Sequence, residues 1–125
     1  MTSQEITDFA LSFPETTEVH PFGPVPDVYK VAGRIFLFLI PEADRPRIAL
    51  KCEPTLALLL REKYPAVTPG YHLNKVHWNS LELDGSIPDD ELQEMIHHSF
   101  DQVVAKLPKA KREWVLRAAS DLERG

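Results

Sequence analysis

Apolar residues recur at helical spacing between Pro88 and Pro108, and this stretch constrains the fold of the chain most strongly. Pro88 suits a helix start, the acidic residues 89–91 complement the positive end of the helix dipole, and Pro108 stops the helix. The stripe consists of Leu92, Met95, Ile96, Phe100, Val103, Val104 and Leu107. A one-sided stripe of this length predicts a long amphipathic helix that covers an apolar core.

Runs rich in β-branched and aromatic residues predict strands upstream of that helix. The candidates span residues 28–32, 34–40, 47–52 and 77–83. Gly33 and the turn-rich residues 41–46 join the first three candidates. We therefore expect these three strands to pair as an antiparallel meander.

Three further helices are predicted around the strands, over residues 2–12, 54–64 and 109–122. Thr2 and Glu5 form a capping-box pattern at the start of the first. The last helix is expected to bury Val115, Ala118, Ala119 and Leu122. The proline-rich segment 14–26 is interpreted as an irregular connection. Helices that bracket antiparallel strands favour an α+β two-layer sandwich with helices on one face of the sheet.

Length and composition limit the class of protein. A chain of 125 residues fits a single domain spanning residues 1–125, and 43% hydrophobic with 26% charged residues is ordinary for a globular protein. Cys52 is the only cysteine, which excludes an internal disulfide and fits a reducing compartment. The longest apolar run, residues 35–40, is too short to cross a membrane, and the N-terminal residues lack the features of a secretion signal. We therefore expect a cytoplasmic protein and a monomer.

Strand alternation indicates which side chains lie on the open face of the sheet, the face without helices. The third candidate strand turns its apolar residues inward and Lys51 outward, and the fourth turns Trp78 outward. Lys75 just precedes the fourth strand, so these three side chains are expected to converge on one surface. In the second candidate strand, the expected register turns Phe36 and Phe38 outward as well.

The segment 72–78 carries the densest set of polar functional groups in the chain: two imidazoles, an amide, a cation and an indole. Lysine meets phosphates as a point charge, asparagine hydrogen-bonds base edges, and tryptophan stacks on a base or a ligand ring. We therefore predict a nucleic-acid-binding site with DNA as the partner, formed by Lys30, Arg34, Arg47, Lys51, Asn74, Lys75, His77 and Trp78. Lys109, Lys111 and Arg112 are expected to add a secondary basic contact.

Two other interpretations of the same residues stay open. In one, Trp78 packs over the sheet beside a hydrogen-bonded His77, and Lys75 is merely solvated. In the other, the surface binds a protein or a small ligand through its aromatic side chains, without phosphate contacts. The formal net charge of −5 argues against a generic polyanion-binding protein, so any contact with an anion must be local.

Catalytic and metal-binding signatures are weak in this sequence. Strand alternation turns Cys52 inward, which is unfavourable for a nucleophile, and there is no phosphate loop, paired-carboxylate signature or nucleotide fingerprint. Glu94 with His98, and His97 with Asp101, lie i and i+4 on a helix, but no third ligand is fixed, so ordinary surface pairing is favoured. We expect a binding protein without a cofactor rather than an enzyme.

Several phrases of the chain carry a resemblance to a known family. They are Val28-Tyr29-Lys30-Val31, Gly33-Arg34-Ile35-Phe36, Leu50-Lys51-Cys52-Glu53-Pro54, Asn74-Lys75-Val76-His77-Trp78, Leu83-Asp84-Gly85-Ser86-Ile87-Pro88-Asp89, Ser99-Phe100 and Lys106-Leu107-Pro108. With them the chain resembles the YjbR/MmcQ family from Phe13 to Pro108. The resemblance implies a frataxin-like (CyaY-like) α+β fold and a DNA-binding function, the label that this family often bears.

The frataxin-like fold implied by the resemblance also suggests an iron-handling alternative. An acidic N-terminal region would then hold the metal, and its residues are Glu5, Asp8, Glu15, Glu18 and Asp27. This alternative rests on the fold alone, whereas function depends on the site.

Overall fold

The computed structural model describes residues 1–124, which form an α+β fold with one antiparallel sheet of six strands. The strands are β1 (Thr16–Val19), β2 (Asp27–Val31), β3 (Arg34–Ile40), β4 (Arg47–Lys51), β5 (Val67–Pro69) and β6 (Trp78–Glu82). Their spatial order is β1-β2-β3-β4-β6-β5, and all neighbours are antiparallel. The predicted fold class and the meander of β2, β3 and β4 are therefore confirmed.

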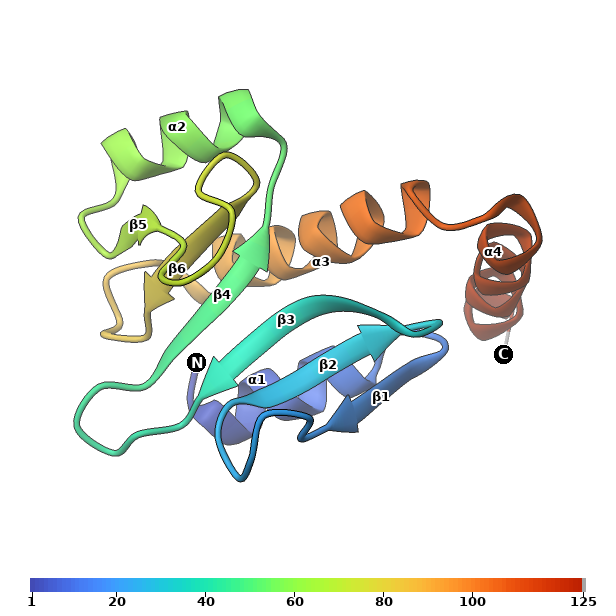
Figure 1. The fold of residues 1–125 in the computed structure, drawn as a ribbon, viewed down its shortest axis with the longest axis horizontal. Helices are drawn as coiled ribbons and strands as arrows, with labels where there is room; N and C mark the ends of the chain where they lie inside the picture. Colours follow the sequence, from blue (N-terminus) through green and yellow to red (C-terminus); the bar gives the residue numbers. More distant parts are fainter. Residues whose placement is uncertain (125) are drawn as a thin grey trace.

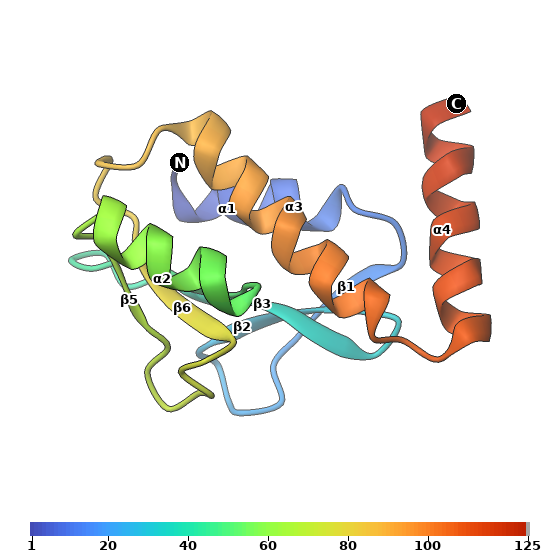
Figure 2. The same cartoon turned by 90° about the horizontal axis from the view of Figure 1, so that it is seen from above.

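Helices cover one face of this sheet and leave the other open. They are α1 (Ser3–Leu11), α2 (Pro54–Lys63), α3 (Asp89–Ala105) and α4 (Lys109–Arg124). Figure 1 shows the open face with α1 and α3 behind the sheet, and Figure 2 shows α1, α2 and α3 on one side of it. The predominantly apolar core lies between α1, α3 and the helix face of the sheet. Helix α4 stands beyond the end of the sheet, after α3 has ended (Figure 2).

Local signals in the sequence account for the ends of several elements. Thr2 and Glu5 form the reciprocal capping box expected for α1. The Glu53 carboxylate caps α2 by accepting from the backbone N–H groups of Thr55 and Leu56, and these hydrogen bonds lower the pKa of Glu53. Ala32 and Gly33 both have positive φ, so β2 and β3 are joined by the tight two-residue hairpin whose twist suits antiparallel strands.

A β-bulge corrects the predicted orientation of Phe36. Tyr29 pairs with Leu37, whereas the next residue of β2, Lys30, pairs with Ile35, so Phe36 is an extra residue on β3. The bulge turns both Phe36 and Leu37 toward the helices, and Phe36 is fully buried there. The expectation that Phe36 lies on the open face was therefore wrong, because simple alternation does not hold across a bulge. Phe38 does lie on that face.

Three other expectations about the fold need correction. The segment 14–26 is not wholly irregular, because β1 forms within it and pairs with β2. The short strand β5 was not predicted either. In α4, Val115 is buried as expected, but Leu122 is 60% exposed because this helix stands away from the main core.

Among residues 1–124, no helix combines the length and the apolar character that crossing a membrane requires.

Because the bulge places Phe36 and Phe38 on opposite faces of the sheet, replacing them by alanine should destabilise the protein to very different degrees. Phe36→Ala should lower the free energy of unfolding by about 3–5 kcal/mol, as expected for a fully buried aromatic ring. Phe38→Ala should cost about 1 kcal/mol, because Phe38 is half-buried on the open face. Urea denaturation of both variants measures the difference, and equal costs would contradict the assigned register.

Candidate nucleic-acid interface

The open face of the sheet carries a row of small and apolar side chains that ends at a tryptophan. Val28, Phe38, Ala49 and Ser80 lie opposite one another across β2, β3, β4 and β6. The indole of Trp78 lies edge-on to the ring of Phe38, with their centroids 5.4 Å apart. Aromatic residues therefore occupy the middle of a face that no helix covers.

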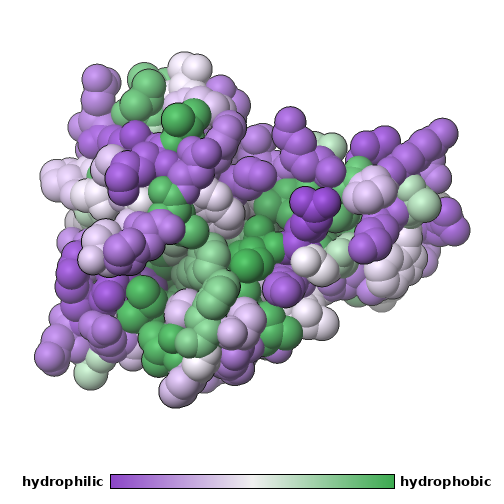
Figure 3. All heavy atoms as spheres, in the orientation of Figure 1, coloured by the Kyte–Doolittle hydropathy of each residue, from purple (hydrophilic) through white to green (hydrophobic). Residues whose placement is uncertain are grey.

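Two loops deepen this face into a hollow, here called the aromatic trough. The β1–β2 loop and the β5–β6 loop both reach beyond the sheet on the side away from the three helices (Figure 2). The hollow between them has a volume of about 390 Å³ and is lined by Phe22, Pro26, Phe38, Ile40, Arg47, Ile48, Ala49, Tyr71, His72, Leu73 and Ser80. Figure 3 shows hydrophobic residues gathered over the middle of this face, with hydrophilic residues around them.

The loop residues of the trough were not predicted from the sequence. Phe22 is 65% exposed and is stacked over Phe38, with ring centroids 6.5 Å apart. Tyr71 is 74% exposed and lies against the ring of His72. Exposed aromatic side chains on loops are a signal for recognition, but each was a single aromatic residue in a segment that we interpreted as a connection.

Lys51 lies directly opposite Trp78 in the β4–β6 pair, so the two side chains share a sheet face as predicted. Lys75 is close to them, because its Nζ donates to the carbonyl of Gly70 at 3.1 Å and Gly70 packs against Trp78. A methyl group at Gly70 would lie 2.8 Å from the Cβ of Trp78, which is a steric clash. Only glycine at this position therefore lets Trp78 pack where it does.

Asn74 and His77 have mainly structural roles in the loop before β6. The Asn74 side-chain oxygen accepts from the backbone N–H of Val76, and its carbonyl accepts from the N–H groups of His77 and Trp78. The His77 carbonyl accepts from the N–H of Cys52 at 2.7 Å, while the His77 side chain is exposed. Asn74 therefore shapes the loop, which leaves the imidazole of His77 free at the surface.

A second hollow, here called the basic groove, lies where β4 ends and α3 continues alongside β3 (Figure 1). It has a volume of about 370 Å³ and is lined by Lys30, Gly33, Arg34, Ile35, Lys51, Val103 and Lys106. The structure thus brings together three predicted site residues and adds Lys106, which sequence analysis did not assign to the site. No carboxylate lines this groove among the residues that the structure describes.

The cations of the basic groove differ from other basic residues because they lack acidic partners. Arg45 pairs with Glu82, and Lys63 pairs with Glu91. Over residues 1–124, none of Lys30, Arg34, Lys51 or Lys106 forms an ion pair within 4 Å. Their charges therefore add to a local positive potential in a protein whose net charge is −5.

Arg47 lies apart from the basic groove. It is at the other end of β4 from Lys51, and its Nη1 donates to the Glu42 carboxylate at 3.1 Å. Arg47 borders the aromatic trough instead. Its charge is largely compensated, so it contributes less to an anion site than the sequence suggested.

The hydroxyl of Ser99 connects α3 to the sheet beside the basic groove. It accepts from the backbone N–H of Lys51 at 2.8 Å and donates to the carbonyl of Phe36 at 2.5 Å. The β3–β4 ladder ends one step earlier, at the pair of Leu37 and Leu50. Ser99 therefore satisfies the two backbone groups where the strands separate, and it fixes the position of Lys51.

Cys52 is buried, as expected, and this raises the pKa of its thiol to about 11. The neighbouring Glu53 carboxylate contributes to this rise, and a neutral thiol is a poor nucleophile.

The residues considered for metal binding fall into separate places. His97 lies 3.6 Å from Asp101, and His98 accepts the backbone N–H of Glu53, so neither belongs to a larger ligand set. From the acidic N-terminal region, the fold gathers Glu18 and Asp27 with His20, the group of three potential ligands found in residues 1–124. His20 Nε2 lies 2.8 Å from an Asp27 oxygen, which is ordinary ion-pair geometry.

The sequence model of the YjbR family matches residues 11–102, including most of the trough and the groove. The chain belongs to the YjbR family. It is 34% identical over 118 residues to the Escherichia coli K12 protein YjbR, covering 94% of this chain and 99% of that protein. It is 38% identical over 106 residues to the E. coli O157:H7 protein YbdF, covering 85% and 87% of the two chains. The names of these relatives state no ligand.

Solved structures of similar proteins support the fold. A Deinococcus radiodurans protein described as a DUF419 domain superposes with a TM-score of 0.85 at 32% identity, covering 91% of this chain and 87% of that one. A crystal structure from Pseudomonas syringae gives a TM-score of 0.72 at 28% identity, covering 82% and 98%.

Removing the Ser99 hydroxyl should weaken the junction between α3 and the sheet. Ser99→Ala leaves two buried backbone groups without their partner, which should lower the free energy of unfolding by about 1–3 kcal/mol. The amide of Lys51 should also exchange with solvent faster in hydrogen-exchange NMR. The matched control is Ser12→Ala, whose exposed hydroxyl bonds only to the carbonyl of Phe9, and its cost should stay below about 0.5 kcal/mol. Equal effects of the two substitutions would contradict this role.

The Cys52 thiol should be almost unreactive in the folded protein. Alkylation by iodoacetamide needs the thiolate, so the native rate at pH 8 should be far below that of the urea-unfolded protein, whose thiol has a pKa of about 8.5. The native rate should rise with pH up to about 11. Native labelling at pH 8 as fast as in urea would show that the thiol is accessible and ionised.

Proposed function

We propose that this protein is a nucleic-acid-binding module that holds a single-stranded segment of DNA across the open face of its sheet. The main support is the continuity of two different surfaces. Lys51 lines the basic groove, Trp78 lies opposite Lys51, and Phe38 joins Trp78 to the aromatic trough. A ligand that alternates phosphates with flat rings fits such a surface.

The basic groove provides contacts for phosphates. Four cations without acidic partners, Lys30, Arg34, Lys51 and Lys106, surround one hollow. Contact with phosphates releases condensed counterions, so four such contacts give a salt dependence of log K on log salt of about −3 for a single strand. Arg34 adds a planar guanidinium, which can bind a phosphate through two hydrogen bonds.

The aromatic trough provides surfaces for bases. Stacking of a base on an aromatic side chain contributes about 1–3 kcal/mol and does not depend strongly on base identity. Phe22 and Tyr71 present the most exposed rings, while Trp78 and Phe38 form the floor between them and the basic groove. The two loops wall this space, so it suits bases that are unpaired and turned outward rather than a duplex.

The proposal predicts salt-dependent binding of a dT oligonucleotide of roughly ten nucleotides, measured by fluorescence anisotropy over a series of NaCl concentrations. The double variant Lys51→Ala/Lys106→Ala should reduce the magnitude of the salt slope by about 1.4, since each phosphate contact on a single strand accounts for about 0.7. Phe22→Ala should weaken binding at every salt concentration by about 1–3 kcal/mol without changing the slope. The matched control Lys63→Ala removes one positive charge between α2 and α3 and should leave both quantities unchanged.

The same titration separates this proposal from protein or small-ligand binding at the open face. The large exposed fractions of Phe22 and Tyr71 would serve either kind of partner. Absence of binding at low salt, or binding equally reduced by Lys63→Ala and by the double variant, would refute the nucleic-acid proposal. Tighter binding of duplex than of single-stranded DNA would refute the role given to the trough.

A further inference from the structure

Helix α4 carries an apolar face that the rest of the protein does not cover. Trp114 is 49% exposed and Leu122 is 60% exposed, although Val115 on the adjacent side of the helix is fully buried. Trp114, Ala118 and Leu122 line a hollow of about 730 Å³ between α4 and residues 11–17. Figure 2 shows α4 standing apart from the rest of the fold, so its Trp114 side stays open to solvent.

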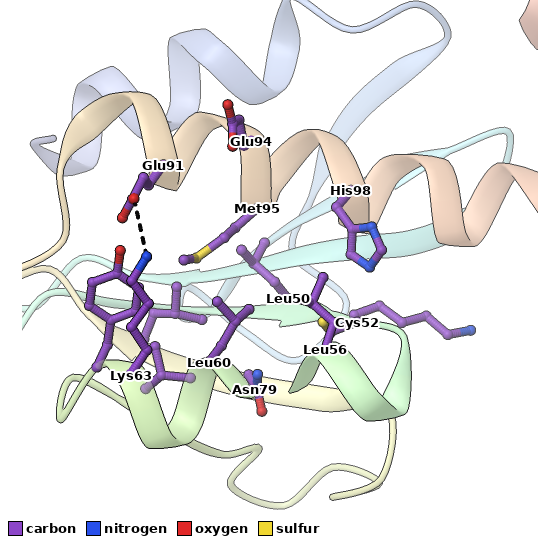
Figure 4. Close-up of a pocket in the computed structure, with 14 residues that line it drawn as sticks. Leu50, Cys52, Leu56, Leu60, Lys63, Asn79, Glu91, Glu94, Met95 and His98 are labelled. Carbon is purple, nitrogen blue, oxygen red and sulfur yellow. Dashed lines mark hydrogen bonds and ion pairs between the residues drawn. The ribbon is translucent and has the colours of Figure 1, made fainter. Parts of the chain in front are cut away.

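The hollow between α2 and α3, drawn in Figure 4, differs from the hollow at α4. It has a volume of about 290 Å³ and is lined mainly by apolar residues. Lys63 of α2 lies 3.4 Å from Glu91 of α3, and this ion pair links the two helices. Within residues 1–123, no ion pair joins α4 to another element. The open face of α4 is therefore not held against residues 11–17 by opposite charges.

Charged residues flank the apolar middle of this face. Lys111, Trp114, Ala118 and Asp121 are spaced by three and four residues, so they lie in one row along the helix. Lys111 and Asp121 are both exposed, and neither forms an ion pair within residues 1–123. The row thus has a positive end, an apolar middle and a negative end.

We propose that a second copy of this chain packs on this face, with the two α4 helices antiparallel. In that arrangement Asp121 of the second copy lies level with Lys111, so both ends of the row meet opposite charges. A parallel pair would place like charges together instead. The same register puts the ring of Trp114 over Ala118 of the second copy, where the small side chain lets the two helices approach closely. Because the pair is two-fold symmetric, each contact is made twice.

The dimer does not depend on the function proposed for the open face of the sheet. None of Lys111, Trp114, Ala118 and Asp121 lines the aromatic trough or the basic groove. The sequence alone led us to expect a monomer, because the packing of α4 in the folded protein decides which of its sides is left uncovered. An uncovered apolar face with charges at its rim is typical of a protein interaction site.

Sedimentation equilibrium of the full-length protein at increasing concentrations tests the dimer. We expect the average mass to rise from that of one chain toward that of two. Lys111→Glu and Asp121→Lys should each raise the dissociation constant about tenfold, because either one turns two attractive pairs into two repulsive pairs. The matched controls Lys109→Glu and Glu123→Lys make the same charge changes on the opposite side of the helix and should have no effect.

An equimolar mixture of the two single variants tests the antiparallel register. In a mixed dimer, the glutamate introduced at position 111 of one copy lies level with the lysine introduced at position 121 of the other. The second pair, Lys111 with Asp121, is native in this dimer. The mixture should therefore dimerise about as tightly as the unchanged protein, whereas each variant alone should dimerise weakly.

Three results would overturn the proposal. They are a mass of one chain even at millimolar concentration, a dimer that neither substitution weakens, and a mixture that dimerises no better than the separate variants. Circular dichroism of each variant shows whether its helices are intact, so that a lost dimer reports on the interface.

Discussion

The hydroxyl of Ser99 holds together the place where β3 and β4 separate, and the basic groove depends on it. Beyond the pair of Leu37 and Leu50, the two strands no longer bond to each other. Ser99 takes over by bonding to Phe36 on one strand and Lys51 on the other. Because the strands separate there, cations from β2, β3, β4 and the C-terminal end of α3 surround one hollow.

The β-bulge at Phe36 acts at the same place. Placing an extra residue on β3 turns Phe36 toward α3, where its ring lies edge-on to the rings of Phe13 and Phe100. The aromatic cluster anchors α3 against the split, so the packing of the core and the shape of the surface have a common cause. A chain with unbroken alternation in β3 would place a phenylalanine on the open face and would lose this anchor.

Sequence periodicity predicted the long elements because their signals are local. The stripe of α3, the capping box of α1 and the β-branched runs of β2 to β4 each lie within one element. The strand β1 has only four residues in a proline-rich segment, so it exists because β2 is available to pair with it. The bulge likewise depends on how β3 packs against α3, so the residue types in β3 alone do not predict it.

In the candidate site, too, the features set by local periodicity were predicted and those set by tertiary packing were not. Alternation correctly placed Lys51 and Trp78 on one face, because both follow from strand periodicity. Lys106 was missed because its place in the groove depends on how α3 crosses the sheet. The predicted role of Arg47 as an anion contact was too large, because its partner Glu42 lies in a loop whose course could not be predicted from the sequence. The hollow between α2 and α3 could not be predicted either, since the residues that line it come from helices and strands that are distant in the sequence.

The side chain of Arg61 connects α2 to the backbone behind the open face. Arg61 of α2 donates to the side-chain oxygen of Asn79 at 2.7 Å, to the carbonyl of Trp78 at 3.4 Å and to the carbonyl of Lys75. Asn79 lines the hollow between α2 and α3, while Trp78 and Lys75 belong to the proposed binding surface. Arg61 therefore joins α2 to the backbone of Lys75 and Trp78 by hydrogen bonds, so the position of this helix and the course of the loop before β6 depend on each other.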